Sequence, residues 1–270
     1  PRCPHAGLPS SASSSARSST DLRHVALVNN RLTKLPAEVT ALGSLTSLSL
    51  DYNLLTELPD AVGALRQLVK LGLYHNRLSR LSERLGELTQ LQTLALQHNK
   101  LAALPPSVRQ LTALTDLSLT SNALTSADFV PHLTSLTQLG LSHNRLTVLP
   151  EDLGGLTRLH SIGVAHNQLT SLPAALLQLP RLAALCASHN RIGPALPPIG
   201  KAAALRTIDV QANQLRELPF TLLGLRNLRA LSAQVADARP RPTTPAHATP
   251  PTPAHNPPAH RLHPPTAPPH

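Results

Sequence analysis

The sequence lacks several residue types that other protein classes depend on. Its 270 residues include no Met or Trp, only 2 Phe and 2 Tyr, and only 2 Cys. Cys3 and Cys186 lie far apart, which argues against a disulfide-rich secreted framework and a cysteine-ligated zinc site, and favours a reducing compartment. No run of about 18 apolar residues is present, so we expect no membrane insertion. Residues 1–20 lack Met and an apolar core, so they are neither a signal peptide nor an obvious native start.

Leucine is abundant by contrast, with 56 residues, or one residue in five. An ordinary globular core mixes leucine with aromatic and β-branched side chains whose shapes interlock. A core that depends this heavily on one side chain indicates a single unit used many times. The balance of 24 Lys and Arg against 14 Asp and Glu gives a net charge of +10, which favours acidic partners in general.

The chain aligns on itself with a 23-residue period. Complete units open at Leu22, Leu45, Leu68, Leu91, Leu114, Leu136, Leu159, Leu182 and Leu205, and a final half-unit opens at Leu228. Every complete unit carries an asparagine at its ninth position, namely Asn30, Asn53, Asn76, Asn99, Asn122, Asn144, Asn167, Asn190 and Asn213. The fifth unit is one residue short, but the missing residue lies after its asparagine. We interpret these nine residues as a structural ladder, because the amide both donates and accepts and can satisfy backbone groups of a turn.

Within each unit the LxxLxL segment alternates apolar and polar residues, which predicts one short half-buried strand. Leu48 and Leu50, for example, are expected to point inward. A Leu-Pro step such as Leu35-Pro36 then removes a backbone donor and fixes φ before a short helical or extended return. Stacked units therefore predict a curved solenoid, with a parallel β-sheet on the concave side and the returns on the convex side.

The pattern LxxLxLxxNxL followed by xxLPxxL resembles the leucine-rich repeat family, and within it the intracellular Ras-scaffold type, over about residues 22–235. This resemblance implies an α/β leucine-rich repeat solenoid in the form of a horseshoe segment. It also implies a cytoplasmic, non-catalytic binding module or scaffold in signal transduction, with small GTPases or signalling complexes as partners.

Composition divides the chain into three parts. Residues 1–21 are Ser-rich and aperiodic and are predicted to be disordered, residues 22–236 form the repeat domain, and residues 237–270 are predicted to be a disordered tail with 12 Pro and 5 His. In the tail, Arg239 to Pro245 fits the RxxPxxP form of an SH3 ligand, although so Pro-rich a segment matches this form easily by chance.

The side chains between the buried strand positions form columns, which are the usual recognition surface of a solenoid. The middle column is small and offers few anchors. We predict a partner-binding surface around two neighbouring tyrosines and a column of five histidines that precede the asparagines; an ordinary exposed surface is the alternative for the tyrosines. The predicted residues are Tyr52, Tyr74, Asp51, Lys70, His75, His98, His143, His166 and His189.

Three explanations of the histidine column are open: a divalent metal site, a pH-dependent surface, or a turn residue copied by repeat duplication. We favour duplication and predict no metal, because no carboxylates converge on the column. Cys186 is expected to be a small concave residue and not a nucleophile.

A column of basic residues follows the asparagines and consists of Arg31, Arg77, Lys100, Arg145 and Arg191. It is either a solvated edge or a contact for an acidic protein. Nucleic acid is not favoured as a partner, because stacking aromatics and a groove-entering helix are missing.

None of the motifs GxSxG, GxxxxGK[ST], GxGxxG or HExxH occurs in the chain. We therefore predict no enzyme activity and no cofactor, and favour a protein-binding module that holds its partner against the concave face and the adjacent basic edge. The alternative is the recognition segment of a larger kinase, GTPase or ubiquitin ligase, and a third is a repeat-expanded scaffold without a dedicated ligand.

Overall fold

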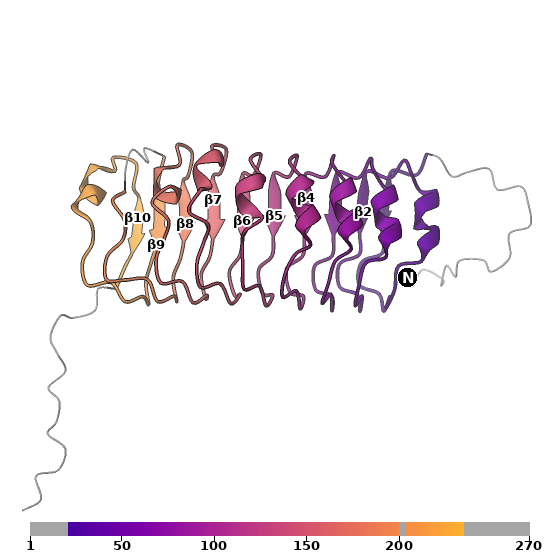
Figure 1. Ribbon diagram of the computed structural model, residues 1–270, viewed down its shortest axis with the longest axis horizontal. Coiled ribbons are helices and arrows are strands. Elements are labelled where there is room, and N and C mark those ends of the chain that lie inside the picture. Colours follow the sequence, from indigo (N-terminus) through magenta and orange to yellow (C-terminus); the bar gives the residue numbers. More distant parts are fainter. Residues whose placement is uncertain (1–20, 200–203, 235–270) are drawn as a thin grey trace, which may run out of the picture. The chain divides into compact units, whose positions relative to one another are not determined.

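The computed structural model describes residues 21–199 and 204–234. Within them, ten three-residue strands form one parallel sheet whose strand order follows the chain (Figure 1). Neighbouring strands pair one repeat apart, so that Leu48 lies beside Leu71. The predicted solenoid with a parallel sheet is confirmed. The strands are β1 (His24–Ala26), β2 (Ser47–Ser49), β3 (Lys70–Gly72), β4 (Thr93–Ala95), β5 (Asp116–Ser118), β6 (Gln138–Gly140), β7 (Ser161–Gly163), β8 (Ala184–Cys186), β9 (Thr207–Asp209) and β10 (Ala230–Ser232).

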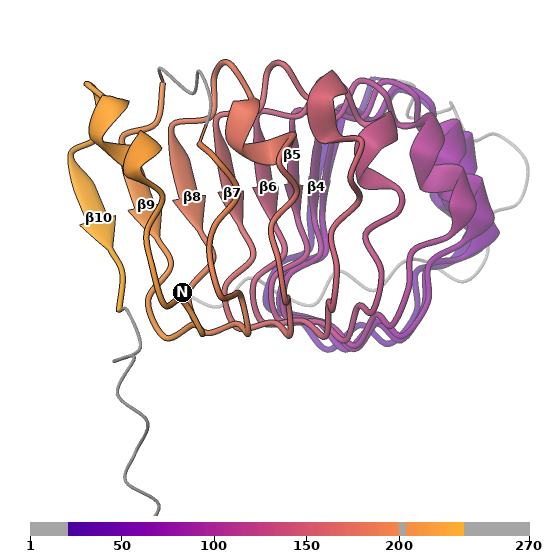
Figure 2. The ribbon, with the colours of Figure 1, turned by 60° about the vertical axis from the view of Figure 1, so that its left-hand side comes forward.

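Short 3-10 helices form the returns, on the side of the stack opposite the sheet (Figure 2). At four of them the residue before the helix is the proline of a Leu-Pro step, held extended with φ between −63° and −69°. The described helices are η1 (Ala37–Ala41), η2 (Asp60–Ala64), η3 (Glu83–Glu87), η4 (Pro106–Gln110), η5 (Val130–His132), η6 (Leu153–Gly155), η7 (Leu176–Gln178) and η8 (Phe220–Gly224). These helices confirm the predicted helical returns.

The core is one continuous cluster of leucines that runs through the repeats. Leu48 and Leu50 are 1% and 0% exposed, as the alternation of the strand predicts. The short fifth unit places Ala127 and Phe129 in this core in place of the missing Leu-Pro step. The added phenyl ring thus fills space that the shorter unit would otherwise leave open.

The asparagine side chains join each repeat to the one before it. In the third unit, Asn76 Nδ2 donates to the carbonyls of Leu50 and Leu73, both at 3.0–3.2 Å, and its Oδ1 accepts from the Leu55 N–H at 3.0 Å. Leu50 and Leu55 belong to the preceding unit. The same three kinds of bond are made by Asn53, Asn99, Asn122, Asn144, Asn167, Asn190 and Asn213.

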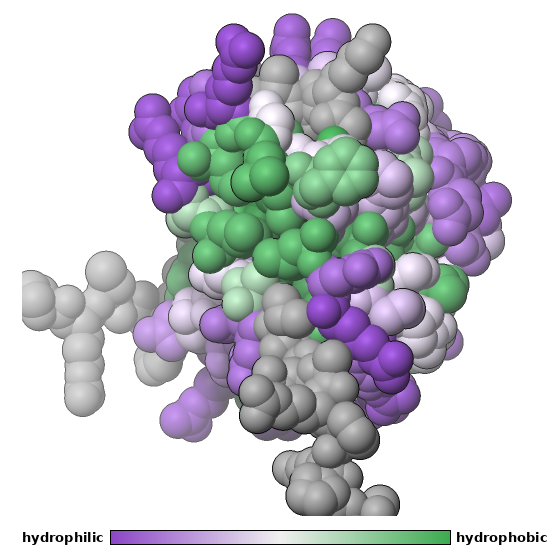
Figure 3. Space-filling model, turned by 90° about the vertical axis from the view of Figure 1, so that its left-hand side faces the viewer, coloured by the Kyte–Doolittle hydropathy of each residue, from purple (hydrophilic) through white to green (hydrophobic). Residues whose placement is uncertain are grey.

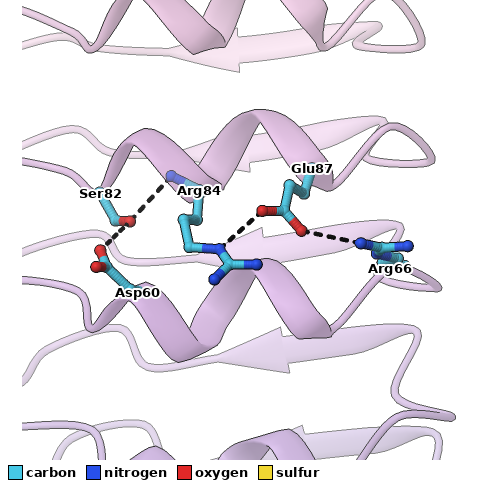
Figure 4. Close-up of polar contacts among 5 residues, drawn as sticks. All are labelled: Asp60, Arg66, Ser82, Arg84 and Glu87. Carbon is cyan, nitrogen blue, oxygen red and sulfur yellow. Dashed lines mark hydrogen bonds and ion pairs between the residues drawn. The ribbon is translucent and has the colours of Figure 1, made fainter.

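Polar contacts also join the returns of neighbouring repeats (Figure 4). Ser82 Oγ donates to Asp60 Oδ1 at 2.6 Å and accepts from the Arg84 N–H at 3.0 Å. Glu87 accepts from Arg84 at 2.7 Å and from Arg66 at 3.2 Å. These hydrogen bonds, that to Arg84 first, lower the pKa of Glu87 below its usual range.

The face at the β10 end of the stack is apolar (Figure 3). Phe220 and Leu223 of η8 are 85% and 92% exposed, and Leu231 of β10 is also exposed. The core edge of the last described repeat is thus open within the described residues. The predicted disordered segments, residues 1–21 and 237–270, lie outside these residues except for Asp21. In the part of the chain that the structure describes, no helix has both the length and the apolar character that a bilayer span needs.

Replacement of a central asparagine should destabilise the repeat domain. Asn144→Ala deprives the Leu124 N–H and the Leu119 and Leu141 carbonyls of buried partners, so the free energy of unfolding should fall by about 3 kcal/mol. Asn30→Ala is the control, because Asn30 is exposed and donates only to the Val28 carbonyl; its loss should be under about 0.5 kcal/mol. Urea unfolding followed by circular dichroism measures both, and equal losses would contradict the ladder.

Gly86 of η3 lets the next repeat approach closely. A Cβ there would lie 2.6 Å from the Ser107 carbonyl oxygen, whereas at Gly154 of η6 a Cβ would meet nothing within 4 Å. Gly86→Ala should therefore lower the free energy of unfolding by about 1–3 kcal/mol, while Gly154→Ala should be neutral or slightly stabilising. Thermal unfolding of the two variants checks this difference, and a neutral Gly86→Ala would show that the returns can separate without cost.

Candidate functional site

Four ring side chains, which we call the aromatic cluster, gather beyond the ends of β2, β3 and β4: Tyr52, Tyr74, His75 and His98. The Tyr52 and Tyr74 rings meet edge to face with centroids 4.8 Å apart, and Tyr52 stacks on His75 at 5.0 Å. His98 lies 5.4 Å from Tyr74 and 5.5 Å from His75. Such pairs contribute about 0.5–1.5 kcal/mol each beyond area burial, so the rings form an ordered surface.

Tyr52 is the most exposed tyrosine of the aromatic cluster, at 44%. A side-chain hydrogen bond with Tyr74 raises the pKa of the Tyr52 phenol further above neutral pH, and desolvation adds to this effect. Tyr52 therefore stays protonated at neutral pH and presents a neutral ring with a polar edge to a partner.

Backbone geometry explains why histidine recurs before the asparagine. The nine residues at this position have φ between 52° and 58°, the left-handed region: Asn29, Tyr52, His75, His98, Ser121, His143, His166, His189 and Ala212. Asn, Asp and His are enriched several-fold in this conformation among non-glycine residues. The turn conformation thus explains why histidine recurs here without any role in ligand binding. The repeat spacing alone did not reveal this conformation.

The remaining three histidines form a second group, the histidine stack. The rings of His143, His166 and His189 lie nearly parallel, with centroids 4.1 and 4.2 Å apart. Ser121 separates this stack from the aromatic cluster. Burial, together with the charges of the two neighbouring imidazoles, lowers the pKa of His166.

A metal ion does not fit the histidine stack. The lone pair of an imidazole nitrogen lies in the plane of the ring. In parallel stacked rings these lone pairs point in parallel directions, so two nitrogens cannot both bind one ion at the distance of about 2.0–2.1 Å that zinc requires. Across residues 21–199 and 204–234, no group of three or more His, Cys, Asp or Glu side chains could hold a metal.

Asp51 and Lys70 lie differently with respect to the tyrosines, Asp51 in contact with the Tyr74 backbone and Lys70 at the other end of the strand. The Asp51 carboxylate accepts from Ser49 Oγ at 2.7 Å and from the Tyr74 N–H at 2.8 Å, so it holds the turn that carries Tyr74. It lies over Gly72, where a Cβ would come within 2.8 Å of its oxygens. Lys70 lies at the opposite end of β3, beside a separate hollow that His24 and Thr46 also line.

A shallow groove of about 440 Å³, the concave groove, runs over β4 to β7. The small middle column forms its floor, where Gly140 and Gly163 carry no side chain and the hydroxyls of Thr120 and Ser142 lie close beside them. Gln97 Oε1 is buried without a hydrogen-bond partner among the described residues. Most of the remaining lining is polar: Thr93, Asp116, Ser118, Thr120, Gln138, Ser142 and Ser161.

The predicted basic edge is discontinuous. Its residues are exposed, but only Arg77 and Lys100 occupy adjacent repeats, because Leu54, Ala123 and Gln168 interrupt the column. The ion pairs found among the described residues, Arg66–Glu87, Arg84–Glu87 and Arg80–Glu57, include none of the five predicted basic residues.

The structure brings together a basic group that the motif search missed. Arg158, His160 and Arg181 line a hollow of about 570 Å³ just before β7 and β8, which we call the cationic hollow. Its other lining residues are Thr137, Gln138, Pro180 and Ala204. In the sequence these residues flank the leucine that opens a unit: Arg158 and His160 flank Leu159, and Arg181 precedes Leu182. The columns around the asparagine do not include these positions.

The leucine rich repeat family model matches residues 20–78, 89–146 and 134–192, together more than half of the chain. A leucine-rich repeat protein of Leptospira interrogans is similar in structure, with a TM-score of 0.76 and 36% identity over 80% of this chain and 56% of that one. YopM, a leucine-rich effector protein from Yersinia pestis, has a TM-score of 0.62 and 27% identity over 77% of this chain and 54% of that one.

The plant peptide hormone receptor RGFR1, whose structure is a complex with RGF2, has a TM-score of 0.67 and 27% identity over 78% of this chain and 39% of that one. The chain thus spans 56% of the length of the Leptospira protein, 54% of YopM and 39% of RGFR1. No curated protein matches the sequence significantly.

Two substitutions of His166 separate its charge from its backbone role. The folded chain binds a proton at His166 at lower pH than the unfolded chain, so the free energy of unfolding should fall as the pH drops through about 6.5, with no such effect well above it. His166→Asn removes this dependence and tolerates φ of 54°. Its stability relative to the wild type should therefore improve between about pH 7.5 and pH 5.

His166→Val is the matched control, because it also removes the titrating ring but resists a left-handed backbone. It should lower the free energy of unfolding by about 1–2 kcal/mol relative to His166→Asn at every pH. Urea unfolding at several pH values measures both effects. The same pH slope in His166→Asn and the wild type would contradict the role of His166.

Proposed function

Because the chain belongs to the leucine-rich repeat family, whose members commonly bind other proteins, we propose that it is a non-catalytic module that holds a protein partner in the concave groove and against the aromatic cluster. The observation that carries the proposal is the position of this groove, which runs over β4 to β7 while the aromatic cluster lies beyond the ends of β2 to β4. The predicted basic edge supplies additional cations after the asparagines.

The groove suits an extended segment of a partner protein. Small floor residues such as Gly140 and Gly163 allow a backbone to approach the sheet closely. Hydroxyl and amide side chains around the floor offer donors and acceptors without a fixed charge. This composition favours main-chain recognition over a buried small-molecule site, since such sites are enclosed and mostly apolar.

The aromatic cluster supplies the anchor that the groove lacks. Binding hot spots are enriched in tyrosine, and the Tyr52 and Tyr74 rings are already ordered by contact with His75 and His98. Rings that are rigid before binding lose little conformational entropy when a partner packs on them. We therefore expect most of the binding energy to arise at this end of the surface.

The proposal also includes an intracellular setting, with small GTPases or signalling complexes as the class of partner. The resemblance to Ras-scaffold repeats supports this class, and the free thiol of Cys186 supports a reducing compartment. The SH3-type motif predicted in the tail lies outside the described residues.

Capture of partners by the whole chain, with proximity labelling and mass spectrometry, tests the proposal. Tyr52→Ala/Tyr74→Ala should reduce recovery of specific partners by about 10-fold or more, because hot-spot tyrosines contribute about 2 kcal/mol or more. Ser118→Trp, which fills the groove floor, should have a similar effect.

Phe220→Ala is the matched control, because it removes an exposed aromatic ring from η8 on the side of the returns, away from the groove. Circular dichroism establishes that all variants fold. If Tyr52→Ala/Tyr74→Ala and Ser118→Trp recover the same partners as Phe220→Ala and the wild type, the aromatic cluster and the concave groove are not the binding surface.

A further inference from the structure

The cationic hollow lies at the other ends of the strands from the aromatic cluster and the basic edge. Arg158 and His160 precede β7, and Arg181 precedes β8, whereas the histidines and the predicted basic residues follow the strands. The hollow meets the concave groove at Gln138, which lines both. It is therefore a separate surface that adjoins the proposed binding groove.

Backbone hydrogen bonds place the cations of this region on successive rungs. The N–H of Ala183 donates to the His160 carbonyl, that of Arg206 to Ala183, and that of Arg229 to Arg206, each at 2.8 Å. Rungs of a sheet are about 4.8 Å apart, so Arg206 and Arg229 continue the basic surface beyond the hollow. Arg158 and Arg181 occupy equivalent positions in adjacent repeats, which brings two exposed guanidinium groups to the same hollow.

These cations are not neutralised by the carboxylates of the sheet side. Within the described residues, the ion pairs lie on the returns and involve none of them. Asp116, on the sheet side, accepts from Thr115 Oγ1 at 2.7 Å, and Asp209 accepts from the Gln211 N–H at 3.2 Å. Like charges held on neighbouring rungs repel one another, and an anionic ligand would relieve that repulsion.

We propose that the cationic hollow binds the carboxylates of an acidic protein segment. Two guanidinium groups can each bind a carboxylate through two parallel N–H···O bonds, and the Gln138 amide provides a further donor at the wall. A nucleic acid is less well matched, because the described lining holds only one ring, that of His160, and no Phe, Tyr or Trp to form a stacking platform for successive bases. The inference stands apart from the proposed function, since an isolated acidic peptide can occupy the hollow without a partner in the groove.

Fluorescence anisotropy of the whole chain with a fluorescein-labelled peptide of alternating Glu and Ser tests this proposal. The wild type should bind the peptide, with an affinity that falls as salt is raised, and should not bind the same peptide with Gln in place of Glu. Arg158→Gln/Arg181→Gln should weaken binding by about 10-fold or more, because it removes both bidentate groups. Arg158→Lys/Arg181→Lys should retain only part of the affinity, because lysine keeps the charge without the planar fork.

The matched control is Arg109→Gln/Arg216→Gln, which removes the same charge from exposed arginines that belong neither to the cationic hollow nor to the predicted basic edge. It should change the affinity by less than about 2-fold at moderate salt. Equal weakening by the two Gln double variants would overturn the proposal, because it would show attraction by net charge alone. Tighter binding of a uridine oligonucleotide than of the Glu peptide, or no binding of the peptide, would overturn it as well.

Discussion

The asparagine side chain that follows each of the strands β2 to β9 is the interaction on which the rest of the structure depends. It satisfies a carbonyl of its own unit while bonding a carbonyl and an N–H of the preceding unit. A buried backbone group without a partner costs about 1–3 kcal/mol, so the turn cannot be buried against its neighbour without this side chain. Once the turns are joined, the strands lie in register and the leucines of successive repeats form one core.

The same turn determines what the concave edge can present. Its left-handed residue admits few side-chain types without strain, and histidine is one of the favoured types. Because the turn repeats on every rung, the rings at this position stack, both in the histidine stack and between Tyr52 and His75. A constraint of backbone conformation thereby produces an ordered surface of rings on which a partner can pack.

Charge is distributed unevenly around the solenoid. On the returns, Glu87 pairs with Arg84 and with Arg66 of the preceding repeat (Figure 4). Glu57 pairs with Arg80 of the next repeat. On the strand-start edge, Arg158 and Arg181 have no such partners among the described residues and lie exposed around a hollow. Exposed ion pairs such as those on the returns contribute little to stability. Unpaired exposed cations such as Arg158 and Arg181 raise the local concentration of anions and increase their association rates.

The sequence alone was enough to predict the fold, because a 23-residue period that buries the same leucines in every unit permits only one register of stacking. It also indicated the small middle column and the neighbouring tyrosines, since both follow from strand alternation. It did not reveal that Asp51 is occupied by the Tyr74 turn, that Lys70 lies apart from the tyrosines, or that Arg158 and Arg181 share a hollow. Those features depend on φ at the turn, on hydrogen bonds between repeats and on contacts between side chains that are 23 residues apart in the sequence. All three arise only when the repeats stack in the folded chain.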